Sequence, residues 1–259
     1  MYGPDGIRVK DRSNRPSTVS SPNRDTPKTG RQSAAAPFAA RSGNVLWAGL
    51  SLFVILATLS AQGKEDAIRC ANLVYGGSHT SRCFSHEFLS AVQRETAIPT
   101  ERRFKSVKLA SRELFRFPFV VMTGEKDFTL SRRERKHLRT YLERGGFLLA
   151  SAGCSSKEWD KAFRREIGRV FDKERKLEKL PMEHPLFRVF NSISELTLSH
   201  PGSPPFLEAL TVDGKAVLVY SKEGLNDTEH AEGCCCCGAN ELTNAMQINM
   251  NILVYALLH

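Results

Sequence analysis

A chain of 259 residues can hold one large domain or two small ones, and its net charge of +9 raises the question of a polyanionic partner. The charge is unevenly spread, because residues 1–44 carry eight basic and three acidic side chains and leave only +4 for the remainder. The remainder has no basic residues interleaved with aromatic ones, so we expect no nucleic-acid partner. Residues 1–44 are rich in Ser, Pro, Arg and Gly, which predicts a disordered basic tail.

An uncharged run of 19 residues, VLWAGLSLFVILATLSAQG at 45–63, follows the tail. A transmembrane helix needs roughly 20 such residues, so the run predicts a single membrane helix or signal-anchor. The small residues Ala61 and Gly63 also suit a signal-peptidase site, and cleavage there would release a secreted protein. A helix buried in a soluble core is a third possibility. The basic tail favours a single-pass protein of the cell membrane, with its N-terminus in the cytoplasm and residues 64–259 outside.

Strand and helix patterns alternate in the exported part, 64–259. Continuous apolar runs in PFVVMTG and GGFLLASA are typical of central strands of a parallel sheet. Alternation of this kind predicts one three-layer α/β domain without internal repeats, to which a hairpin turned at Asp213-Gly214 is added. The expected elements, in chain order, are a strand at 68–75, a helix at 85–96, a strand at 118–124, a helix at 131–146, a strand at 147–152, a helix at 159–171, a hairpin at 209–221 and an apolar helix at 242–258.

Three stretches in this order resemble the bacterial family called domain of unknown function 4159. They read LFRFPFVVMTGEKDFTLSRRERKHLRTYLERGGFLLASAGC, LPMEHPLF and CCCCGANELTNAMQINMNILVYAL, and the likeness covers about residues 67–259. The resemblance implies a parallel sheet of the flavodoxin-like, class I glutamine amidotransferase-like kind. It also implies an exported or membrane-anchored protein, but it implies no established biochemical role.

In an open parallel sheet, ligands bind beyond the carboxyl ends of the strands. The loops that follow two expected strands at this edge supply six candidate ligand-binding residues: Gly76, Gly77, Ser78, His79, Gly124 and Glu125. Gly-Gly-Ser at a strand end could present N–H groups to an anion, although a tight turn explains it more simply. Neither of the two glycine-rich nucleotide-binding motifs is present, so we expect no cofactor.

Cys154 follows the strand in GGFLLASA, at the start of the next helix. In the amidotransferases that the family resembles, a cysteine at such a turn is the nucleophile, so the resemblance implies this role for Cys154. The nearest candidate base is His184 in Glu183-His184-Pro185, an order unlike the His-Pro-Glu of the amidotransferases. The sequence also allows a structural interpretation, because Ser155-Ser156-Lys157-Glu158 is a capping-box pattern with Ser155 as the N-cap. We favour the structural interpretation, because a catalytic triad needs three groups and only one is well placed.

Seven cysteines leave at least one thiol free, or paired between chains, in an exported protein. Cys234 and Cys237 have the spacing of a disulfide or a metal-binding pair. We expect a disulfide between these two, or between one of them and Cys83, because bonds between adjacent cysteines are strained. A metal held by two of these thiols with His79 or Cys83 is the second possibility, and simple packing against the last helix is the third.

These observations favour an extracytoplasmic, membrane-anchored domain that binds a ligand or an unknown protein partner without turning it over. The alternative is a cysteine-dependent hydrolase or amidotransferase-like enzyme that uses Cys154 and His184. The two hypotheses differ in the reactivity that they predict for Cys154.

Overall fold

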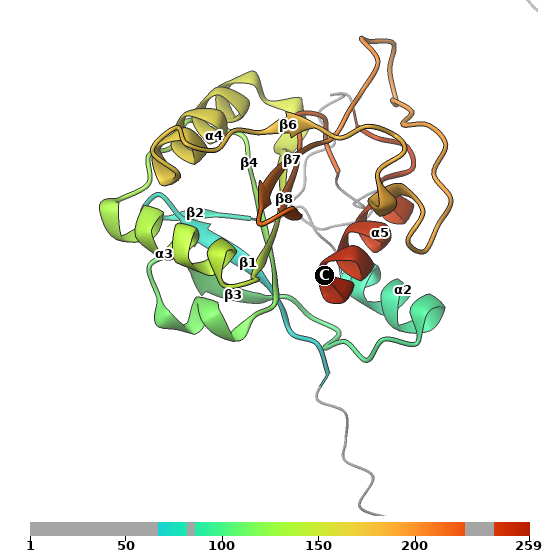
Figure 1. Ribbon diagram of the computed structural model, residues 1–259, viewed down its shortest axis with the longest axis horizontal. Coiled ribbons are helices and arrows are strands. Elements are labelled where there is room, and N and C mark those ends of the chain that lie inside the picture. Colours follow the sequence, from blue (N-terminus) through green and yellow to red (C-terminus); the bar gives the residue numbers. More distant parts are fainter. Residues whose placement is uncertain (1–66, 82–85, 226–240) are drawn as a thin grey trace, which may run out of the picture. The chain divides into compact units, whose positions relative to one another are not determined.

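A mostly parallel sheet runs through the centre of the protein in the computed structural model, which describes residues 67–81, 86–225 and 241–259 (Figure 1). Its central strands are apolar on both faces, as expected for strands covered by helices on each side. The strands are β1 (Cys70–Tyr75), β2 (His79–Thr80), β3 (Lys105–Lys108), β4 (Phe119–Gly124), β5 (Phe147–Ala152), β6 (Glu178–Lys179), β7 (Glu208–Val212) and β8 (Lys215–Ser221).

Five strands are parallel, in the order β3-β1-β4-β5-β8. Antiparallel strands extend the sheet beyond β8, since β7 pairs with β8 and β6 pairs with β7. The short β2 folds back on the end of β1. The carboxyl ends of β1, β4 and β5 therefore lie along one edge of the sheet. The strand order reverses at β1, which has β3 on one side and β4 on the other.

Helices cover both faces of the sheet (Figure 1). One apolar core lies under α3 and α4, and the other lies under α2 and α5. A mixed α/β fold with three layers is thereby confirmed. The helices are α2 (His86–Thr96), α3 (Arg132–Glu143), α4 (Lys157–Val170) and α5 (Ala245–Leu258), with short 3₁₀ turns η1 (Arg112–Arg116), η2 (Gly153–Ser155) and η3 (Pro185–Phe187).

The sequence predicts α3 as a helix at 131–146, with a Ser131–Glu134 capping box at its start and a stop at Gly145. Ser131 Oγ accepts a hydrogen bond from Glu134 N at 3.3 Å, and Ser131 N donates to Glu134 Oε2 at 2.7 Å, which completes the capping box. Beyond the other end, Gly145 adopts a φ of 87°, a conformation that glycine reaches without steric cost. The capping box is confirmed, and the helix ends at Glu143, before the predicted end at 146.

The hairpin is the element whose role differs from the prediction. Its turn at Asp213-Gly214 is confirmed, with φ values of 50° and 79°. Its second strand is no addition, however, because β8 pairs in parallel with β5, with Leu148 opposite Leu218. Every residue of β8 after Lys215 is buried, so this strand belongs to the centre of the sheet.

Two asparagines lie within the apolar helix α5 and tie neighbouring loops to it. Asn249 Nδ2 donates to Leu225 O at 2.7 Å, just after β8. Asn251 Nδ2 donates to Leu186 O at 2.9 Å and to Asn191 O at 2.8 Å. These bonds satisfy the amide N–H groups of both side chains, as burial of polar groups requires.

The described ranges contain no helix that is both long and apolar enough to cross a membrane. The tail at 1–44 and the uncharged run at 45–63, for which we expect disorder and a membrane helix, lie outside the described residues.

Candidate functional site

The carboxyl edge of the sheet brings together the loops chosen from the sequence. Gly76 to His79 follow β1, Glu125 follows β4, and Cys154 follows β5. Because these strands are parallel neighbours, their ends lie side by side. This is the edge at which open α/β sheets bind ligands, next to the point where strand order reverses.

The glycines after β1 form a tight turn. Gly76 and Gly77 adopt φ values of 53° and 88°, which a residue with a side chain rarely tolerates. Gly76 N donates to Glu134 Oε1 at 2.8 Å, so this N–H is already used within the protein. The His79 ring stacks on Tyr75 at 5.7 Å between centroids, while Ser78 is exposed. The contacts of this turn support a role in holding β2, and they do not support an anion site.

Aromatic side chains fill the crevice between β1 and β4. Tyr75 Oη donates to Thr123 O at 2.8 Å and accepts from Trp159 Nε1 at 2.8 Å, which links both strands to α4. Phe128 packs edge-on against Tyr75 at 4.8 Å. A Cβ at Gly124 would lie 2.3 Å from Tyr75 Oη and 2.6 Å from Trp159 Nε1. A side chain at position 124 would overlap these atoms, so the packing requires glycine there.

Cys154 occupies a sharp strand-to-helix turn. Its φ of 51° and the φ of 47° at Ser155 are two successive left-handed conformations, unusual for residues other than glycine. Cys154 is disulfide-bonded. Cys154 Sγ lies 3.5 Å from Glu125 Oε1, but a disulfide sulfur has no proton to donate, so we treat this approach as packing.

The helix cap beside the cysteine is one residue later than predicted. Ser156, rather than Ser155, is the N-cap of α4, and its Oγ accepts from Trp159 N at 3.2 Å. Ser156 Oγ also donates to Glu125 O, so the same hydroxyl holds the β4 loop. Glu158 therefore does not form the predicted capping box, and its Oε1 accepts a hydrogen bond from Asp127 N at 3.1 Å instead.

His184 lies away from Cys154. It caps η3, where its Nδ1 accepts from Leu186 N at 3.2 Å, and its ring is 5.4 Å from that of Tyr255. Burial, followed by the charge of His259, lowers the pKa of His184. Lys215 Nζ, at the first residue of β8, donates to the main-chain oxygen of His259 at 3.0 Å, so this region is at the amino edge of the sheet. The structure does not bring the predicted catalytic pair together.

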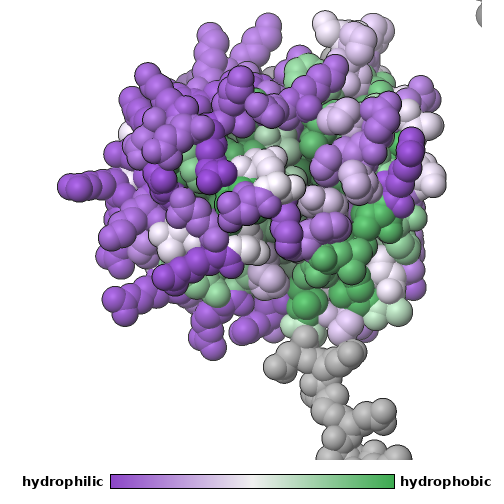
Figure 2. Space-filling view, in the orientation of Figure 1, coloured by the Kyte–Doolittle hydropathy of each residue, from purple (hydrophilic) through white to green (hydrophobic). Residues whose placement is uncertain are grey.

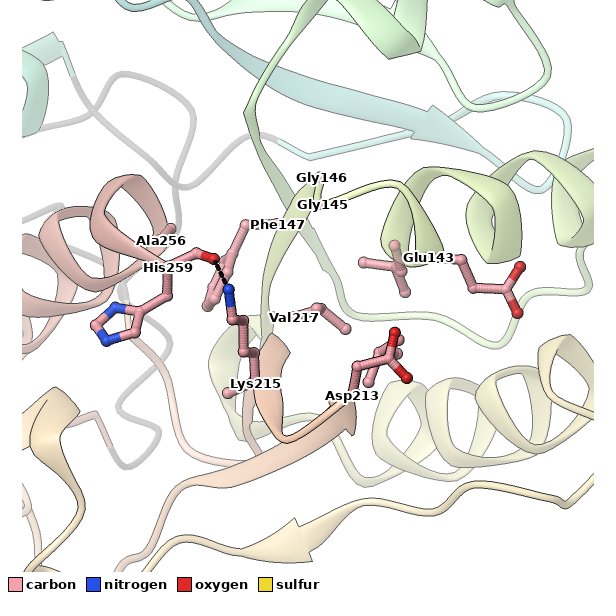
Figure 3. Close-up of a pocket in the computed structure, with 12 residues that line it drawn as sticks. Glu143, Gly145, Gly146, Phe147, Asp213, Lys215, Val217, Ala256 and His259 are labelled. Carbon is pink, nitrogen blue, oxygen red and sulfur yellow. Dashed lines mark hydrogen bonds between the residues drawn. The ribbon is translucent and has the colours of Figure 1, made fainter.

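A pocket of about 210 Å³ opens at this amino edge (Figure 3). It is bounded by the start of β5, the β7–β8 turn and the end of α5, and the Lys215–His259 hydrogen bond crosses one side. The lining contains Glu143, Asp213 and Lys215 but none of the candidate residues chosen from the sequence. Its position opposite the carboxyl edge gives it no role in the expected ligand site.

Sequence reasoning missed a buried polar group near the ends of β5 and β8. Ser151 Oγ accepts from Leu225 N at 2.9 Å and donates to Glu223 O at 3.3 Å. Around it, Ser221 Oγ, Glu223 Oε2 and Asn249 Oδ1 are buried without a hydrogen-bond partner among the described residues. The available signal was the serine at the end of each apolar strand and Asn249 within an apolar helix.

The remaining cysteine predictions fall outside the described residues. Cys83, Cys234 and Cys237 lie in 82–85 and 226–240, so the structure does not address the predicted disulfide or metal pair. Within the described ranges, no group of three or more His, Cys, Asp or Glu side chains could hold a metal ion. Cys70 is a free thiol in β1, and burial, with a smaller contribution from Glu101, raises its pKa to about 12.

One family model matches the chain. It is described as Domain of unknown function (DUF4159), and the match covers residues 69–257, which is most of the chain and all but the outermost of the described residues. No curated protein gives a match.

We predict that Gly124→Ala destabilises the protein by roughly 1–3 kcal/mol, because the new methyl group overlaps Tyr75 Oη and Trp159 Nε1. The same substitution should cost about 1 kcal/mol less in a Tyr75→Phe background, which lacks the nearer of these atoms. Urea unfolding of the four proteins in this double-mutant cycle measures the difference. Additive effects would contradict the steric explanation.

We also predict that Glu223→Gln stabilises the protein at neutral pH. Burial raises the pKa of Glu223, and the neighbouring Lys222 offsets only part of that rise. Because the folded state then holds the proton more tightly than the unfolded state, Glu223 lowers stability as pH rises above about 4.3, its unfolded value. Unfolding curves should show that the variant is more stable than the native protein at pH 7. This difference should disappear below a pH of about 4.3. Exposed Glu178→Gln is the control, and an equal gain there would contradict the prediction.

Proposed function

The chain belongs to the family Domain of unknown function (DUF4159), and from that premise we propose that residues 64–259 form an extracytoplasmic, membrane-anchored domain. Its proposed role is to bind a ligand or a protein partner without turning it over. The alternative remains a hydrolase or amidotransferase-like enzyme that uses Cys154.

The disulfide at Cys154 is the observation that carries this proposal. Disulfides persist in oxidising compartments, so a bonded Cys154 fits a domain exported from the cytoplasm. The nucleophile of a cysteine enzyme is the thiolate, which a disulfide removes. The disulfide at Cys154 therefore supports both an extracytoplasmic location and a role without cysteine catalysis.

The order of the parallel strands supports the finer assignment of the fold. The order β3-β1-β4-β5-β8 corresponds to that of flavodoxin-like sheets. In those sheets the second parallel strand along the chain, here β3, lies at the edge beside the first. The amidotransferase-like part of the assignment depends on the cysteine at the turn after β5. That part also needs a base, and His184 is not beside Cys154.

The membrane anchor is proposed from the sequence. The uncharged run at 45–63 is long enough to span a bilayer, and the basic tail before it favours a cytoplasmic N-terminus. Cleavage after Gly63 would instead give a secreted domain with the same exposure to an oxidising compartment.

Binding is a better fit than catalysis at the carboxyl edge. The buried side chains of Tyr75, Trp159 and Phe128 pack together in the crevice between β1 and β4, where an open α/β sheet would hold a small substrate. The exposed parts of the edge are loops, among them Ser78 and Glu125, which suit contact with a larger partner.

We predict that Cys154 in the native, unreduced protein does not react with iodoacetamide at neutral pH. The reason is that a disulfide sulfur carries no thiolate, and alkylation should appear only after reduction. Peptide mapping of the full chain purified from membranes, with Cys154→Ser as the blank, measures the modification. Stoichiometric alkylation before reduction would favour the cysteine enzyme.

We further predict that alkaline phosphatase fused after His259 is active. The enzyme needs an oxidising compartment to form its disulfides, and the positive tail should place His259 there. A cytoplasmic reporter at the same position serves as the control. An inactive phosphatase with an active cytoplasmic reporter would reverse the topology.

A further inference from the structure

A positively charged pocket lies beside the end of α4, on the face of the domain covered by α3 and α4. Its volume is about 470 Å³, and it is lined by Arg135, Gly168, Arg169, Asp172 and Lys173. Hydrophilic side chains cover this side of the molecule in Figure 2, in contrast to the apolar area near α5. A second hollow of about 240 Å³ adjoins it and shares Gly168 and Lys173. None of these residues belongs to the carboxyl edge.

Several arginines of this region depend on one buried carboxylate. The side chain of Glu166 is 1% exposed. Its carboxylate oxygens lie 2.8 Å from a nitrogen of Arg169, 3.1 Å from one of Arg165 and 3.6 Å from one of Arg135. Arg165 has a second partner in Asp127. Arg135 and Arg169 have no other carboxylate partner among the described residues, so a single negative charge serves both guanidinium groups that line the pocket. These two groups together carry one positive charge more than Glu166 balances.

The other charged residues of the lining are Asp172 and Lys173. Asp172 Oδ2 accepts from Arg139 at 3.0 Å, but Arg139 also pairs with Glu143 and Glu174, so Asp172 adds negative charge to the lining. Lys173 has no hydrogen bond from its side chain and no ion pair among the described residues. The ammonium of Lys173 offsets the Asp172 carboxylate, so the excess of one positive charge remains.

The backbone leaves the floor of the pocket open. Gly168 lies within α4, where glycine is disfavoured, yet a Cβ there would meet no atom within 4 Å. The chain then turns through Asp172 and Lys173 with φ values of 50° and 62°, left-handed conformations that non-glycine residues seldom adopt. Lys173 N donates to Gly168 O at 2.8 Å, which fixes Lys173 beside the open floor.

We propose that this pocket binds a phosphate group. Arginine forks match the oxygen atoms of phosphate, and the excess of one positive charge in the lining favours an anion. The phosphate could belong to a soluble phosphomonoester or to the headgroup of a lipid, since both present the same oxygen atoms. A simpler alternative is that these cations only complement the negative end of the α4 dipole. The proposal does not depend on the location of the domain or on the state of Cys154.

The test uses the full chain in a neutral detergent, titrated with inorganic phosphate and separately with dihexanoyl phosphatidic acid. Calorimetry and thermal unfolding should give a dissociation constant of about 1 mM or tighter for at least one of them. Arg169→Gln/Lys173→Gln should weaken that binding about tenfold or more, because charge-assisted hydrogen bonds are lost. Lys157→Gln/Lys161→Gln, which removes equal charge from exposed positions on α4, should leave it nearly unchanged.

A second variant keeps the test independent of folding. Gly168→Leu places a side chain over the open floor, where a Cβ meets no atom within 4 Å, so the ligand-free melting temperature should hold or rise while phosphate binding is lost. Binding of phosphatidic acid alone identifies a lipid headgroup, and binding of inorganic phosphate identifies a soluble source as sufficient. The proposal is overturned if neither probe binds, or if both pocket variants bind as the native protein does.

Discussion

The Tyr75 hydroxyl sets the character of the carboxyl edge. It joins β1, β4 and α4 through two hydrogen bonds, and it requires glycine at position 124 because no side chain fits beside it. The crevice in which an open α/β sheet would hold a small ligand is thus filled by the protein itself. The described surface at this edge is then a rim of loops, and a separate charged pocket lies beside α4.

Elements defined by local chemistry could be predicted from the sequence. The Ser131–Glu134 capping box, the Asp213-Gly214 turn and the buried strands β4 and β5 are decided by residues close together in the chain. The edge strand β3 was missed, because three of its four residues are polar and exposed and give no apolar run. The parallel pairing of β8 with β5 could not be read from its turn, since register between distant strands depends on tertiary packing.

The candidate site shows the same division. Strand ends predicted which loops share an edge, so Gly76, Glu125 and Cys154 were placed correctly on one side. Which side chains come within reach of each other depends on the tertiary structure. His184 was paired with Cys154 on residue type and resemblance alone, and the two lie apart. The shift of the cap from Ser155 to Ser156 has a similar cause, because the bond from Ser156 Oγ to Glu125 O joins segments far apart in the chain. Glu166 looked like an ordinary residue of an amphipathic helix until its arginine partners were known.

The parallel pairing of β5 with β8 also has a consequence for folding. The whole of α4 and the chain up to β7 must be made before β8 can occupy its place, so the contact has a high order and should form late. Until then β5 presents an apolar, unpaired edge at Leu148, Leu149 and Ala150, the type of surface on which partly folded chains aggregate. Anything that shields this strand before β8 arrives would therefore favour correct folding over aggregation.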